Sequence, residues 1–174
     1  DLRSPTNSIL SFLDIMTHDG DSMTPQERRS IYERMERAGR HMLNLIADLL
    51  EMVQIESGKY SLKTEPLALS SLCKEVLQNM QGSFKAKDIH TSFHVGLGEL
   101  RVNMDRQKGI QILTNILSNA LKFTPRGGRV DLGLDVQGKI MVLEVKDSGP
   151  GIPDDELQKV FDRFAKLSTK ATEG

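Results

Sequence analysis

The sequence lacks several features that mark particular classes of protein. It has one cysteine, Cys73, so no disulfide can form within the chain, which fits a reducing compartment. The formal net charge is −1, so no strong field of one sign favours binding to nucleic acid or to an anionic membrane. The apolar runs are too short to span a bilayer, and no signal-peptide pattern opens the chain. We expect this segment to be cytoplasmic and to make no direct contact with a membrane. A membrane-anchored sensor upstream of it is compatible with that expectation.

The first 58 residues show the patterns of two helices. The first is expected over residues 2–18, with Pro5 in its opening turns, where a missing N–H costs least. The second begins at Thr24, where Thr24, Pro25 and Glu27 form the signature of a capping box with proline at the first helical position. We expect Gly58 to end it and residues 56–59 to form a hinge. Ion pairs between residues four apart are expected for Glu33 with Arg37 and for Glu36 with Arg40.

A heptad-like seam runs along the second helix. Its apolar residues recur in alternating steps of three and four: Ile31, Met35, Ala38, Met42, Leu45, Leu49 and Met52. Burying each such large side chain stabilises the fold by roughly 1.5–3 kcal/mol. Two antiparallel helices alone cannot bury so broad an apolar face. We therefore expect two hairpins to pair as a four-helix bundle. The alternative is that the face packs against the second domain of the same chain.

Residues 59–174 mix strands and helices without a regular alternation. Strands are expected at 60–67 (ended by Pro66), 89–95, 100–104, 129–136 and 139–146, the last two as a hairpin. One helix is expected after a cap at Ser70 or Ser71, with an apolar face of Leu72, Val76, Leu77, Met80 and Phe84, and another after a cap at Asp105. This order favours an α+β fold, a two-layer sandwich, over a doubly wound sheet.

The helix after Asp105 has two distinct faces. Its apolar stripe consists of Ile110, Leu113, Ile116, Leu117 and Leu121. Asn115, Asn119 and Lys122 share a second face, and two amides with an ammonium suit a site for a metal and phosphates. Gly109 costs up to about 1 kcal/mol of helix propensity and predicts a looser contact there.

Four motifs, in order, resemble those of two-component sensor histidine kinases. DLRSPTNSIL resembles the segment that follows the phosphoacceptor histidine, and NILSNALKFTP resembles the N box. DSGPGIP resembles the first glycine-rich box, and VFDRFAKL resembles the F box. The resemblance covers essentially the whole chain. It implies a dimerisation and histidine-phosphotransfer hairpin at 1–58 and an ATP-binding domain of the Bergerat type at 59–174.

The resemblance also implies roles for individual residues. Asn119 coordinates Mg²⁺, Asn115 and Lys122 orient and neutralise the ATP phosphates, and Asp147 reads the adenine N6 amine. The set implied to bind nucleotide is Asn115, Asn119, Lys122, Phe123, Asp147, Gly149, Gly151 and Ile152. In the hairpin, Asp1 acts as the general base beside the histidine that precedes it, and Ser4 stands where relatives orient a water with Thr or Asn.

Two departures from the family pattern concern the ends of the chain. The resemblance implies a phosphoacceptor histidine one position before Asp1 and a second glycine-rich box beyond Gly174. We expect the ATP domain to be incomplete at its C-terminus and the fragment alone to be inactive. His18 is followed by Asp19 but lies near the C-terminal end of the first expected helix, where we expect it to interact with the helix dipole, and His41 has no adjacent acidic residue.

The function implied is transfer of the ATP γ-phosphoryl group to a hairpin histidine and then to an aspartate of a response regulator. A gyrase- or chaperone-type ATPase is a rival, but those enzymes carry a glutamate where Asn115 stands. The remaining alternative is a dimeric scaffold or phosphotransfer protein that has lost ATP binding.

Overall fold

The computed structural model describes residues 2–96, 101–138, 140–162 and 172. The chain forms two compact units, one ending at Ser61 and the other beginning at Leu62.

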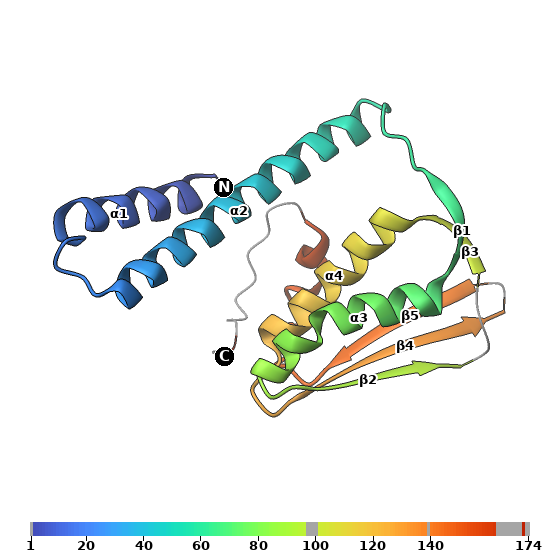
Figure 1. The fold of residues 1–174 in the computed structure, drawn as a ribbon. Helices are drawn as coiled ribbons and strands as arrows, with labels where there is room; N and C mark the ends of the chain where they lie inside the picture. The colour runs from blue at the N-terminus through green and yellow to red at the C-terminus, as the bar shows by residue number, and fades with distance from the viewer. Residues whose placement is uncertain (1, 97–100, 139, 163–171, 173–174) are drawn as a thin grey trace. The chain divides into compact units, whose positions relative to one another are not determined.

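The first unit is a hairpin of two helices, α1 (Arg3–Asp19) and α2 (Pro25–Glu56), shown in blue to cyan in Figure 1. The predicted capping box is confirmed: Thr24 Oγ1 accepts from the Glu27 amide at 3.3 Å, and the Glu27 carboxylate accepts from the Thr24 amide at 2.8 Å. The helix ends where Gly58 adopts a φ of +67°, as predicted.

The apolar face of this hairpin is only partly covered within the unit. Most seam residues are half-buried, whereas Leu49 is 45% exposed and the flanking Leu50 and Leu43 are 59% and 64% exposed. One predicted ion pair forms, between Arg40 and Glu36. The other was assigned wrongly, because Glu33 pairs with Arg29, four residues earlier, at 3.1 Å.

The second unit combines two sheets with helices. Its elements are β1 (Thr64–Ala68), α3 (Leu69–Ala86), β2 (His90–Val95), β3 (Arg101–Asp105), α4 (Arg106–Phe123), β4 (Arg129–Gln137), β5 (Ile140–Asp147) and the 3₁₀ helix η1 (Leu157–Phe161). β1 pairs with β3 in an antiparallel ladder. β4 lies between β2, parallel to it, and β5, antiparallel to it. The predicted α+β class and the β4–β5 hairpin are confirmed.

Helices α3 and α4 cover one face of the three-stranded sheet (Figure 1). The alternating residues Val130, Leu132 and Leu134 of β4 are buried beneath them, together with Leu113 and Leu117 of α4. This packing fixes which side of α4 faces the core. It therefore leaves the opposite side of that helix exposed.

Several local expectations for this unit were wrong. β1 starts four residues later than expected and includes Pro66, which an edge strand tolerates because its missing N–H breaks no central ladder. α3 begins at Leu69, directly after β1, and no side chain caps it, so neither Ser70 nor Ser71 is the cap.

Two expectations for α4 also need correction. Ile116 is 40% exposed and is not part of the buried stripe. The contact at Gly109 is tight: a β-carbon there would lie 2.7 Å from Leu72 Cδ2 and 3.0 Å from Met104 Cε. The glycine therefore permits close packing of α4 on its neighbours, at the expense of helix propensity.

Candidate functional site

The start of α4 is fixed by the carboxylate of Asp105. Its Oδ1 accepts from the amides of Gln107 and Lys108 at 3.0 and 3.2 Å, and Oδ2 accepts from the Lys63 amide at 2.9 Å. The hydrogen bond from Lys63, followed by those within the helix, lowers the pKa of this carboxyl below its ordinary value. One side chain thus caps the helix, as predicted, and holds it to the chain just before β1.

The polar face of α4 presents Asn115, Asn119 and Lys122 to solvent. The Lys122 ammonium lies 4.9 Å from the centroid of the Phe123 ring, close enough for a cation–π contact. In the described part of the chain neither asparagine amide makes a hydrogen bond. Their oxygens are therefore available to a ligand.

A divalent cation on this face would depend on the asparagines. Among the residues that the structure describes, no group of three or more His, Cys, Asp or Glu side chains could hold a metal ion. A neutral amide oxygen fits Mg²⁺ when phosphates and waters complete the coordination shell. The donor set of α4 therefore fits a metal that arrives with a nucleotide.

The glycine loop after β5 packs directly against the end of α4. Asp147 Oδ1 accepts from the Gly149 amide at 2.8 Å, which turns the chain tightly. A β-carbon at Gly149 would lie 2.9 Å from the carbonyl oxygen of Phe123. Ser148 Oγ accepts from the Arg129 amide at 2.9 Å and anchors the loop to β4. Phe123, Asp147 and Gly149 are thus brought together by the fold.

The loop continues through Gly151, whose φ of +73° lies in the left-handed region that favours glycine. Ile152 follows it and is 39% exposed. Both residues were predicted to bind nucleotide. The structure places them immediately beyond the Asp147–Gly149 turn.

Two residues near this site are not indicated by any pattern in the sequence. Lys87, at the C-terminal end of α3, is buried and donates to the carbonyl oxygens of Leu121 and Lys122. Thr124 is fully buried, and its Oγ1 has no hydrogen-bond partner among the residues that the structure describes. A lysine after an amphipathic helix usually signals solvent exposure, so only the fold could reveal the burial of Lys87.

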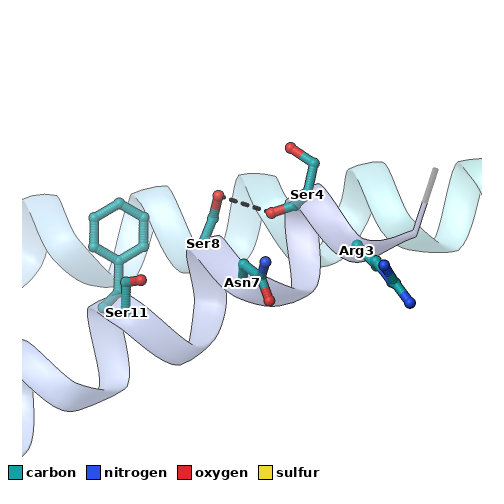
Figure 2. Close-up of a pocket in the computed structure, with 6 residues that line it drawn as sticks. Arg3, Ser4, Asn7, Ser8 and Ser11 are labelled. Carbon is teal, nitrogen blue, oxygen red and sulfur yellow. Dashed lines mark hydrogen bonds between the residues drawn. The ribbon is translucent and has the colours of Figure 1, made fainter.

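On α1, Ser4 lies on an exposed polar stretch with Arg3, Asn7, Ser8 and Ser11 (Figure 2). Its carbonyl oxygen accepts from Ser8 Oγ at 3.0 Å, and its own hydroxyl points away from the helix. These residues line an open depression of about 620 Å³. The predicted base, Asp1, lies outside the described residues.

Comparison with known families matches both units. Residues 1–58 match the His Kinase A (phospho-acceptor) domain. Residues 104–174 match the histidine kinase-, DNA gyrase B- and HSP90-like ATPase family.

Relatives match along nearly the whole chain. A sensor-like histidine kinase of Rhizobium meliloti is 30% identical over 99% of this chain and 33% of its own length. The sensor histidine kinase WalK of Bacillus subtilis is also 30% identical over 99% of this chain, and over 28% of its own length. The chain thus spans about a third of these curated relatives.

Solved structures show the same fold. The histidine kinase AdeS of Acinetobacter baumannii aligns with a TM-score of 0.76 at 21% identity, over 91% of this chain and 77% of its own. Full-length ShkA in complex with AMPPNP aligns at 0.71 and 25% identity, over 94% of this chain and 35% of its own. ThkA in complex with the response regulator TrrA aligns with a TM-score of 0.71 at 22% identity. The alignment covers 95% of this chain and 48% of the ThkA chain.

The two family models therefore define the class: this chain belongs to the sensor histidine kinases and forms their catalytic core. Within the residues that the structure describes, no helix is both long and apolar enough to cross a membrane.

Proposed function

We propose that this chain is the ATP-dependent kinase core of a two-component system. It would transfer the γ-phosphoryl group of ATP to a histidine of the hairpin, and then to an aspartate of a response regulator. The observation that carries this proposal is the packing of Gly149 against the Phe123 carbonyl. Because of it, the glycine loop and the end of the asparagine-bearing helix form one continuous surface.

The polar face of α4 would bind the phosphates. The exposed amide of Asn119 would coordinate Mg²⁺, which when bound neutralises charge on the phosphates. Asn115 and Lys122 would orient and neutralise the same groups. Since the opposite face of α4 is locked into the core, these side chains are presented in a fixed direction, as phosphoryl transfer by positioning requires.

The adenine ring would be read by Asp147. Its Oδ1 is engaged by the Gly149 amide, which leaves Oδ2 to accept a hydrogen bond from the exocyclic N6 amine. Gly149 and Gly151 have no side chains to keep a planar ring away from the backbone, and the adjacent Ile152 offers an apolar surface. ShkA, 25% identical to this chain, has been solved with the ATP analogue AMPPNP.

The hairpin would supply the acceptor and the dimer interface. We place the acceptor histidine directly before Asp1, with Asp1 as its base and Ser4 one turn further along α1. The exposed apolar side chains of α2 would be covered by a second copy of the hairpin. The boundary near residue 58 would separate this hairpin from the nucleotide-binding domain, and the compact units divide three residues later. A response regulator would be the partner, as TrrA is for ThkA.

Calorimetric titration of the full-length kinase with ATP and Mg²⁺ tests the nucleotide site. We expect Asn119→Ala to weaken Mg·ATP binding at least tenfold, about 1.4 kcal/mol, without changing the melting temperature, because the residue is exposed. Ser118→Ala, an exposed neighbour, is the matched control. Equal affinities for Asn119→Ala and the control would contradict the metal role. A chain that binds no ATP would favour the scaffold alternative.

Phosphoryl transfer is tested in the full-length kinase. Incubation with γ-labelled ATP should give acid-labile, alkali-stable label on the histidine before Asp1. Replacing that histidine with glutamine should abolish the label. Label that persists would place the acceptor elsewhere.

A further inference from the structure

Lys87 is a buried lysine whose ammonium joins three parts of the second unit. The residue is 9% exposed, at the C-terminal end of α3. Its Nζ donates to the carbonyl oxygens of Leu121 at 3.0 Å and of Lys122 at 3.3 Å. It also lies 3.1 Å from the carbonyl oxygen of Thr172 and 2.9 Å from Thr172 Oγ1.

These contacts saturate the lysine. An ammonium has three hydrogens, and four acceptors surround it, so no donor is left for a ligand. No carboxylate pairs with Lys87 in the part of the chain that the structure describes. Its charge is balanced instead by the last carbonyls of α4, which carry the negative end of the helix dipole and lack partners within the helix.

Thr172 converges on the same turn of α4. Its amide donates to the Lys122 carbonyl oxygen at 3.2 Å. Its hydroxyl lies 3.0 Å from that oxygen and 2.8 Å from the Thr124 carbonyl oxygen. The hydroxyl can therefore accept from Lys87 while it donates its single hydrogen to one of these carbonyls. The Lys122 carbonyl oxygen is the common acceptor of Lys87 and Thr172.

We propose that Lys87 is a positioning residue for nucleotide binding, which holds the last turn of α4 and Thr172 together. This inference rests on the proposed function, because Lys122 and Phe123 of that turn are assigned to the nucleotide site. Lys87 does not touch the nucleotide. It fixes the position of the Lys122 side chain and of the Phe123 carbonyl that packs against Gly149. Through its contacts with Thr172, it makes that position depend on Thr172.

The test combines nucleotide affinity with a measurement that needs no nucleotide. Lys87→Met keeps the length of the side chain but removes its donors and charge, and Lys85→Met, an exposed lysine two residues earlier, is the matched control. For Lys87→Met we expect Mg·ATP affinity to fall at least tenfold and the Thr172 amide to exchange at least tenfold faster. Lys85→Met should change neither, and Lys87→Arg should recover part of both.

A double-mutant cycle separates positioning from general destabilisation. Thr172→Val removes the hydroxyl alone and should weaken Mg·ATP binding severalfold. Combined with Lys87→Met, it should add little, because both variants break one network. Additive effects on affinity, or unchanged affinity in Lys87→Met, would overturn the inference. If Lys87→Met does not fold, Lys87→Gln and Thr172→Val provide the same comparison.

Failure of the inference is distinguishable from failure of the proposed function. A full-length wild-type kinase that binds no Mg·ATP would overturn the proposed function. The exchange of the Thr172 amide would still be measured in that chain. Unchanged exchange in Lys87→Met would show that Lys87 does not hold Thr172 to α4.

Discussion

Gly149 and Phe123 are 26 positions apart in the sequence, yet the α-carbon of Gly149 faces the Phe123 carbonyl so closely that no side chain fits between them. A β-carbon at position 149 would lie 2.9 Å from that oxygen and 2.6 Å from Asp147 Oδ1. The contact unites the loop that would read adenine with the helix that would bind phosphate. A glycine here is required by the close approach of two backbone segments.

Gly149→Ala should therefore impair both stability and nucleotide binding. Because the clash at Phe123 is with backbone atoms, which cannot rotate away as the Asp147 side chain could, we expect a loss of about 1–3 kcal/mol in the free energy of unfolding. Gly82→Ala is the control: nothing lies within 4 Å of its added β-carbon, and alanine favours the helix. Urea unfolding of both variants, with calorimetry, would check this. A Gly149→Ala variant as stable as wild type would show that the contact is looser than described.

Asp147→Asn should lose adenine recognition and keep the loop. The amide oxygen can still accept from the Gly149 amide, so the turn should persist. Its NH₂ group, however, presents a donor to the N6 amine, a mismatch that costs on the order of 1–3 kcal/mol. We expect ATP affinity to fall while the weak affinity for GTP is unchanged, with Asp154→Asn as an exposed control. Equal losses for ATP and GTP would identify Asp147 as a structural turn residue only.

Stability should fall in acid through Asp105. Its pKa is lowered in the folded state, so its contribution is present above the ordinary carboxyl range and is lost as pH falls through the lowered value. Asp105→Ala should have a lower melting temperature than wild type at pH 7, and the difference should shrink below about pH 4. Thermal unfolding across pH 2.5–7, a range that brackets ordinary carboxyl titration, would measure it. A difference that does not depend on pH would contradict the assigned cause.

Leu45→Glu should disrupt the dimer. Leu45 lies in the seam of α2, where a second hairpin would bury a carboxylate without a partner. Asn44→Glu, on the exposed outer side of the same turn, should leave association unchanged. Analytical sedimentation of both variants would measure their association state. A wild-type chain that sediments as a monomer would refute the four-helix bundle.

Local features of this fold were predictable because the interactions that create them span few residues. The capping box of Thr24 with Glu27 and the cap at Asp105 are both closed within one turn. Where two local partners compete, the sequence is ambiguous: Glu33 has an arginine four residues away on each side and pairs with Arg29. At α3, which begins directly after β1, no side chain caps the helix, although the sequence offers Ser70 and Ser71.

The motifs identified the side chains of the candidate site because each motif is a short, ordered pattern. The motifs predict Asn115, Asn119 and Asp147 as site residues without knowledge of the fold. What the patterns could not give is how the segments pack. The tight contact at Gly109 depends on Leu72, from another helix. A looser contact was expected because helix propensity describes one helix in isolation.

The sequence by itself determined the two helices of the hairpin, the α+β class, the kinase family and the residues proposed to bind nucleotide, since caps, periodicity and motifs are properties of neighbouring residues. Only the tertiary structure decided that Gly149 closes on Phe123 and that Lys87 is buried against the end of α4 and Thr172. These contacts join residues as far as 85 positions apart. They arise from the packing of whole elements around one core, a constraint that no local pattern contains.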